Sequence, residues 1–261
     1  MAAPVRRFWD PVETASTAII TVDEYSNPQS DQYTMEASVW HVWEHIPRPY
    51  FPDRAPAVGA DHYAIEREAY RGPPAAASIH KPDVIVVRLR APPAPVVPPV
   101  PGQRPQRAQE RDILWIECKA PSEGAPNGWN SVMTEAVARL SSAHPTREVY
   151  LILAIGIKWM CFLWDPVNPL PMGSELHIIS AGQTVWAVDA RVKPIPNLAG
   201  QRHIGNSFLV DTTQAYSLDY WSVKLVQNVV VQANLADLQL LENVFALIQA
   251  QNFNGWNPAH F

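Results

Sequence analysis

The sequence has little cysteine, little charge and no long apolar run, and each shortage excludes a class of protein. Cys118 and Cys161 are the only two cysteines in 261 residues, too few for a disulfide framework. We therefore expect reduced core thiols in an intracellular protein, in the cytoplasm or the nucleus. Charged residues make up 17% and hydrophobic residues 47%, which excludes disorder over most of the chain. The longest apolar run, 149–164, is interrupted by Gly156 and Lys158 and is too short to span a bilayer, so no membrane partner is expected.

Motifs of several functional classes are also missing. The chain has no Gly-x-Ser-x-Gly elbow and no Gly-rich phosphate loop, which leaves esterase and nucleoside-triphosphatase functions without support. Signatures of helix-turn-helix, zinc-finger and RNA-recognition domains are lacking too. No apolar stretch follows the first arginines, so no secretory signal is expected. Because 20 Lys and Arg face 25 Asp and Glu, coating of nucleic acid by bulk charge is disfavoured, whereas a local basic patch is compatible with this balance.

Proline, in contrast, is abundant. Its 26 residues are about twice the usual share, and the densest stretch, 91–109, predicts an extended surface loop. No fixed-period repeat and no Gly- or Ser-rich linker divides the chain. We therefore expect one domain over 1–261, with a core at about 31–164, the Pro-rich insertion within it, and a C-terminal extension at 165–261.

The hydrophobic pattern predicts an α/β fold. Period-two and period-3.6 patterns favour the following elements. Helices are expected at about 31–45, 130–142 and 235–249, and strands at 83–89, 112–119, 149–155, 158–164, 176–179 and 184–190. Ser30 or Asp31 would cap the first helix, and Met35 would lie on its apolar face. The segment 61–71 fits a strand slightly better than a helix, and both remain open. The order helix, strand, strand, strand, helix, strand indicates one mixed sheet with helices on its faces.

Charged residues stand at the ends of two of these strands. Asp83 opens the first strong strand, and Glu117 and Lys119 close the next. Alternation places Glu117 and Lys119 on one face with Ile113 and Trp115, and the other face is apolar. Burial of a carboxylate or ammonium group is costly unless the group is paired or holds a metal. A hairpin of the two strands would bring the three charged side chains to one corner of the sheet.

Pro82-Asp83 together with Glu117-Cys118-Lys119 resembles the signature of the PD-(D/E)XK nuclease superfamily. The expected order of elements over 31–164 is similar to the αβββαβ core of that restriction-endonuclease-like fold, and the segment 153–164 resembles uncharacterised fungal members.

The resemblance implies a nuclease that hydrolyses phosphodiester bonds of DNA or RNA with Mg²⁺ or Mn²⁺ as cofactor. It implies that the metal ligands are the carboxylates of Asp83 and Glu117 and the backbone carbonyl of Cys118, because Mg²⁺ prefers oxygen. Lys119 would then favour the hydroxide form of the attacking water and stabilise the transition-state charge.

The same resemblance implies one more acid, on the first helix. Glu36 is the predicted residue, and Glu66 or Glu68 would take its place if 61–71 were the helix. In the family, the helix after the Glu-x-Lys strand often carries polar groups for substrate. Glu135 and Arg139 lie one turn apart on this helix, and a surface ion pair is favoured over such a role.

Basic residues gather around the two strands and are predicted to contact phosphate, with an ordinary solubilising loop as the alternative. They are Lys81, Arg88, Arg90, Arg104, Arg107 and Arg111. The expected partner is a nucleic acid, and the sequence leaves a homodimer open.

Two rival functions are considered. The first is a catalytically silent nuclease-like fold that binds nucleic acid or protein. The second is a zinc protease, because His41-Val-Trp-Glu44-His45 matches the H-x-x-E-H pattern. The histidines lie opposite the apolar helix face, and Pro47 ends the helix, so the protease is the weaker alternative.

Overall fold

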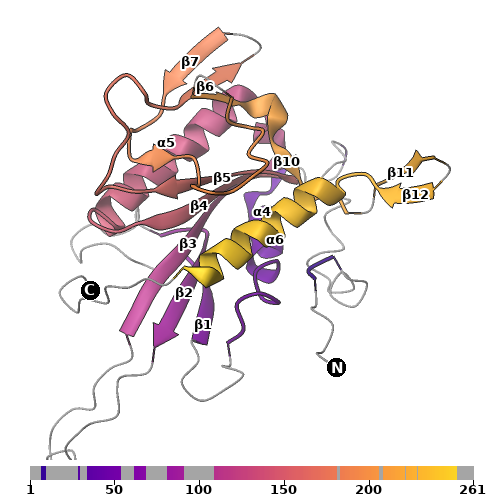
Figure 1. Cartoon of the computed structure of the whole chain (residues 1–261), viewed down its shortest axis with the longest axis horizontal. Helices are drawn as coiled ribbons and strands as arrows, with labels where there is room; N and C mark the ends of the chain where they lie inside the picture. The colour runs from indigo at the N-terminus through magenta and orange to yellow at the C-terminus, as the bar shows by residue number, and fades with distance from the viewer. Residues whose placement is uncertain are drawn as a thin grey trace, which may run out of the picture.

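A mixed β-sheet with helices on both faces forms the centre of the molecule (Figure 1). The computed structural model describes residues 7–9, 29, 34–53, 62–68, 81–90, 109–180, 183–205, 208–220, 222–227 and 229–251. The main sheet has the strand order β1-β2-β3-β4-β5-β10, and β8 also pairs with β5. Its strands are β1 (His62–Arg67), β2 (Val84–Arg90), β3 (Gln109–Lys119), β4 (Val149–Ile155), β5 (Lys158–Trp164), β8 (Val192–Lys193) and β10 (Tyr216–Ser217).

The first three strands form an antiparallel meander, and the fourth reverses the pattern. β1 pairs with β2 and β2 with β3 in antiparallel register, whereas β3 and β4 are parallel. A parallel pair needs a crossover connection, and α5 (Pro126–Ala143) provides it after the short 3₁₀ helix η2 (Pro121–Glu123). β5 then returns antiparallel to β4 through a tight turn. The prediction of an α/β fold with a mixed sheet is confirmed. The prediction of a single sheet is not, because two smaller sheets are also present.

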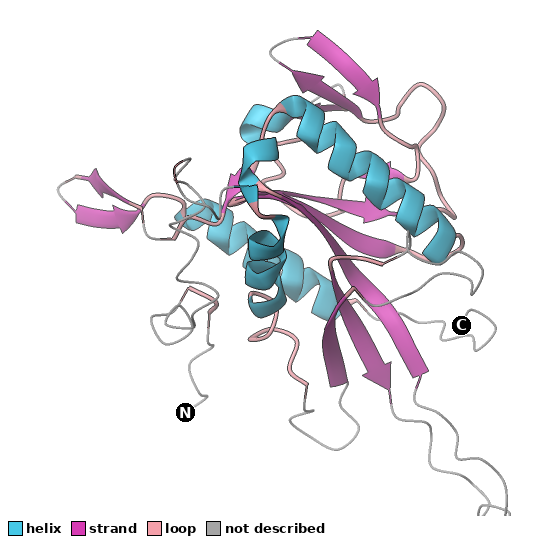
Figure 2. Ribbon diagram, turned by 180° about the vertical axis from the view of Figure 1, so that it is seen from behind, coloured by secondary structure: helices cyan, strands magenta, loops and turns pink. Residues whose placement is uncertain are grey.

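Two layers of apolar side chains hold the helices to the sheet. Figure 2 shows the helices and the sheet from behind. One layer joins α4 (Glu36–His45) and α6 (Leu235–Ala250) to one face of the sheet, with Trp43 and Trp159 fully buried in it. The other joins α5 to the opposite face, where Trp115 and Trp164 are fully buried. Every residue of β4 is buried, as expected for a central strand covered on both sides. Among the described residues, no helix has the length and apolarity needed to cross a membrane.

Two details of the predicted helix and strand faces are wrong. The first helix begins at Glu36 with Met35 at its N-cap, so the predicted caps Ser30 and Asp31, which lie outside the described residues, do not start it. Met35 is 47% exposed because it precedes the helix and does not follow its apolar face. The register between β2 and β3 shifts at one point: Val86 pairs with Leu114 and Val87 with Asp112, so Ile113 of β3 has no partner residue on β2. This bulge places Ile113 in the same apolar layer as Leu114, so strict alternation fails there.

The segment 61–71, which the sequence leaves open, contains strand β1 and no helix within its described part. The predicted strands at 158–164, 176–179 and 184–190 correspond to β5, β6 (His177–Ser180) and β7 (Gln183–Ala187), and the last two belong to a small separate sheet with β9 (Leu209–Asp211). The C-terminal helix is confirmed as α6. The short strands β8 to β10, the 3₁₀ helix η3 (Thr212–Gln214) and the projecting hairpin β11–β12 (Val223–Val226, Val229–Gln232) have no counterpart in the prediction (Figure 1).

Candidate active site

The predicted corner residues meet where the ladder between β2 and β3 ends. Val84 of β2 pairs with Ile116 of β3. Asp83 directly precedes Val84, and Glu117 directly follows Ile116, so the register brings the two acidic residues opposite each other. Lys119 is the last residue of β3. We call Glu36, Asp83, Glu117, Lys119, Glu135 and Arg139 the acidic corner; the contacts that join them are given below.

Asp83 is fixed by the backbone of the neighbouring strand. Its Oδ2 accepts a hydrogen bond from the Cys118 N–H at 2.6 Å, and its Oδ1 lies 3.7 Å from Nη1 of Arg139. Burial raises the pKa of Asp83 to about 6; the Cys118 N–H opposes this rise and the Glu36 charge adds to it. The protein therefore holds this carboxylate in a position where its negative charge is costly.

Glu117 is the most buried member of the acidic corner, with a side chain 1% exposed. Its Oε1 accepts a hydrogen bond from Nε1 of Trp115 at 2.5 Å, and its Oε2 pairs with Nη1 of Arg139. Burial first, and the Asp83 charge second, raise the pKa of Glu117 well above its ordinary range, although Arg139 opposes the rise. Both oxygens of this carboxylate are thus engaged by donors.

Lys119 connects the two helical layers at the end of β3. Its Nζ lies 2.8 Å from Oε2 of Glu135 on α5 and 3.2 Å from Oε2 of Glu36 on α4. Burial alone would lower the pKa of Lys119, but the hydrogen bonds and charges of the two glutamates raise it above its ordinary value. The amine is therefore a protonated donor at neutral pH, and Glu36 is the helix acid that reaches the corner, because Glu66 lies on strand β1 and Glu68 just after it.

The backbone behind Lys119 depends on one glycine. Gly156 turns β4 into β5 with a φ of +56°, and its N–H donates to the Lys119 carbonyl at 3.1 Å. A Cβ atom at this position would come within 2.9 Å of the Pro121 side chain. Glycine is therefore required both for the left-handed backbone and for the close approach.

Arg139 and Glu135 are the site residues that the sequence interpretation missed. The interpretation as a surface ion pair is wrong: the pair is present, but it lies over the end of β3. Arg139 bonds Glu117 and Glu135 and is 17% exposed, and Glu135 also binds Lys119. The sequence signal that could have placed them in the site is their spacing of four residues on the crossover helix. The inner side of such a helix faces the strand ends, because the helix must cross the sheet to reach β4.

No family model, curated protein or solved structure matches the chain. Within the part of the chain that the structure describes, no three His, Cys, Asp or Glu side chains form a ready-made metal cage. The acidic corner nevertheless has four carboxylates, from Glu36, Asp83, Glu117 and Glu135, against the two cations Lys119 and Arg139. The carboxyl groups outnumber the cations, and their oxygen donors fit one hard divalent cation.

The three predicted phosphate-contacting residues whose side chains the structure describes, Lys81, Arg88 and Arg111, do not form one surface. Lys81 is exposed near Asp83, whereas Arg88 and Arg111 pair with each other's backbones near the opposite end of the hairpin. Arg88 is only 6% exposed, and its Nη1 donates to the Gln251 carbonyl at 3.2 Å. Arg104, Arg107 and the Arg90 side chain lie outside the described residues.

The H-x-x-E-H segment lies at the end of α4. His41 is exposed and its Nδ1 is 3.2 Å from Nη1 of Arg67, while Glu44 pairs with both Arg48 and Arg67. These contacts to two arginines disfavour a zinc site, because each competes with a cation for the same groups.

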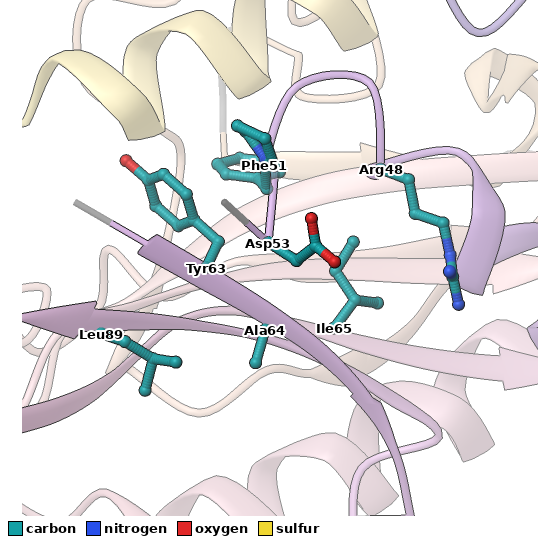
Figure 3. A pocket seen from close by; sticks show the side chains of 8 residues that line it. Arg48, Phe51, Asp53, Tyr63, Ala64, Ile65 and Leu89 are labelled. Atoms are coloured by element: carbon teal, nitrogen blue, oxygen red, sulfur yellow. The ribbon is translucent and has the colours of Figure 1, made fainter. Parts of the chain in front are cut away.

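A separate hollow of about 580 Å³ lies between the loop after α4 and strand β1 (Figure 3). Phe51 and Tyr63 line it, packed edge to face with ring centroids 5.3 Å apart, together with Arg48 and Asp53. No residue of the acidic corner lines this hollow, so we do not include it in the candidate active site.

Proposed function

We propose that the chain is a divalent-metal-dependent nuclease of the PD-(D/E)XK type. The single observation that carries the proposal is the meeting of Asp83, Glu117 and Lys119 at one strand end. Arg139 contacts Asp83 and Glu117, and Lys119 is linked to Arg139 through Glu135. The order α4-β1-β2-β3-α5-β4, with β3 parallel to β4, supports a restriction-endonuclease-like core.

The donor set supports a magnesium or manganese site. Asp83 and Glu117 would supply carboxylate oxygens, and their pKa values are raised first by burial and then by nearby like charges, which a cation would neutralise. The Cys118 carbonyl is the third candidate ligand. The Cys118 N–H is directed to Asp83, whereas the carbonyl of the next residue, Lys119, accepts from Gly156 on the opposite side of β3. Because the N–H and carbonyl of one strand residue point to the same side, the Cys118 carbonyl is directed to the Asp83 side.

The chemistry follows from the charges. A bound divalent cation would neutralise phosphate charge and activate a water molecule. Protonated Lys119 would donate a hydrogen bond to developing negative charge, which is worth most in a water-poor corner. Glu36 and Glu135 would hold the ammonium group in position, since both pair with it.

The test is cleavage of single- and double-stranded DNA and RNA with Mg²⁺ or Mn²⁺, with EDTA as the metal-free control. Lys119→Ala and Asp83→Ala should each lower the rate by about 10²-fold or more. Lys193→Ala is a matched control, because Lys193 is a similarly buried lysine that pairs with Asp165 away from the corner.

Cleavage that persists in either corner variant would refute the proposed site. If the wild type cleaves no substrate under any condition, the catalytically silent binding module is favoured, and binding of the same nucleic acids would then identify its partner.

A further inference from the structure

We propose that Arg139 is an internal counter-ion of the acidic corner, which an incoming divalent cation must displace; this inference rests on the proposed metal-dependent function. Nη1 of Arg139 bonds Glu117 and lies 3.7 Å from Oδ1 of Asp83, so one N–H group faces both carboxylates proposed as ligands. Nη2 bonds Glu135, one helical turn earlier on α5.

The guanidinium and a metal ion compete for the same atoms. Arginine is charged at all working pH values and can only donate. An oxygen that ligates Mg²⁺ at about 2.1 Å cannot keep a close contact with a guanidinium group on the same side, because the two cations would repel each other. Arg139 therefore occupies the direction from which Glu117 and Asp83 would bind a cation.

Arg139 is the donor that can leave. Glu117 has two donors, Trp115 on Oε1 and Arg139 on Oε2. Trp115 is fully buried among apolar side chains, so its N–H is fixed by packing. Arg139 is longer, flexible and 17% exposed, and Glu135 keeps hold of its second nitrogen. Displacement would therefore break only the contacts to Glu117 and Asp83 and leave the guanidinium tethered beside the loaded metal.

The contact between Arg139 and Glu117 also stabilises the folded protein. A buried carboxylate without a partner is strongly destabilising, and Glu117 is 1% exposed. Arg139 compensates this charge until metal arrives. The same contact must weaken metal binding, because the energy of the ion pair is lost when the cation enters.

The experiment measures Mn²⁺ binding by calorimetry in the full chain, without any substrate. Arg139→Met should bind Mn²⁺ about tenfold more tightly than the wild type, and Arg139→Lys should lie between the two. Arg191→Met is the control, because Arg191 pairs with Asp189 away from the corner and should leave the affinity unchanged. Thermal unfolding in EDTA should show a lower Tm for Arg139→Met, and Mn²⁺ should raise its Tm more than that of the wild type.

The outcomes separate the two proposals. If the wild type binds no Mn²⁺, the proposed metal-dependent function fails. If the wild type binds but Arg139→Met binds equally or more weakly, the counter-ion role is overturned while the function stands. Should Arg139→Met not fold even with Mn²⁺, Arg139→Lys decides: tighter binding than in the wild type supports the role, and unchanged or weaker binding overturns it.

Discussion

His203 connects the C-terminal extension to the central sheet, and its burial predicts a defined loss of stability in acid. The imidazole is fully buried between strand β5 and strand β10. Its Nε2 is 3.0 Å from the Cys161 carbonyl, and its Nδ1 is 2.9 Å from the Tyr216 hydroxyl. Because a carbonyl can only accept, Nε2 carries the proton. In the neutral ring Nδ1 then accepts the proton of the Tyr216 hydroxyl, for which the Gly200 carbonyl, 2.9 Å from the same oxygen, competes. The pKa of His203 is lowered from its ordinary 6.5 to about 4, mainly by burial. The Cys161 carbonyl opposes this shift, and the Arg202 charge adds to it.

The sign and size of the effect follow from these two values. Below pH 6.5 the unfolded chain binds a proton that the folded protein refuses, so stability is complete above pH 6.5 and falls as the pH is lowered toward 4. Between pH 7.5 and 5, His203 should lower the free energy of unfolding by about 2 kcal/mol, with about 3 kcal/mol lost near pH 4.

Urea unfolding at pH 7.5 and pH 5, followed by tryptophan fluorescence in EDTA, measures this loss. Other groups titrate in the same range, so the quantity to compare is the pH-dependent change in wild type minus the change in His203→Gln. His41→Gln, at an exposed position, is the matched control and should behave as the wild type. An equal pH dependence in His203→Gln and wild type would refute the argument that the neutral imidazole is the folded form.

Three further changes test the surroundings of the acidic corner and the projecting hairpin. Gly156→Ala should lower the free energy of unfolding, measured in urea, by about 2–4 kcal/mol, because of the positive φ and the close contact to Pro121. The control Gly124→Ala, whose Cβ would make an ordinary contact, should lower it by less than about 1 kcal/mol. Equal losses in the two variants would contradict the backbone argument. Trp115→Phe should cost about 1–3 kcal/mol, because Glu117 loses a buried donor, and an unchanged midpoint would contradict that hydrogen bond. Val230→Lys, on a residue 64% exposed, should change stability by less than about 0.5 kcal/mol; a larger loss in the same assay would show that this hairpin face is packed.

Much of the sheet could be predicted because its strands carry strong patterns. β4 and β5 are apolar, β-branched or aromatic runs bounded by turn residues, and their positions match the prediction within a residue. The short strands β8 and β10 have two residues each and take their structure from pairing with β5. No local pattern of two residues can predict such pairing, since it depends on what the folded sheet leaves open.

The acidic corner was predictable in its strand residues and, through the resemblance, in Glu36, but not in its two residues on α5. Asp83, Glu117 and Lys119 are charged residues at the ends of apolar strands, where burial of a charge is costly. This conflict between charge and expected burial is visible in the sequence. Glu135 and Arg139 show no such conflict, because an i,i+4 ion pair on a helix is ordinary on a solvent-exposed face. Their role depends on the direction in which α5 crosses the sheet, which is a tertiary property.

One proline accounts for the way the corner opens. The ladder of β2 and β3 ends at Val84 and Ile116, and two residues further Pro82 would stand opposite Cys118. Proline has no N–H, so it cannot continue the ladder there. The Cys118 N–H turns instead to the Asp83 carboxylate at 2.6 Å, and the Cys118 carbonyl receives no ladder donor from Pro82. The proline before Asp83 therefore replaces a backbone hydrogen-bonded pair by a contact from the Cys118 N–H to the Asp83 side chain. For this reason the regular hairpin ends in a cluster of oxygen atoms.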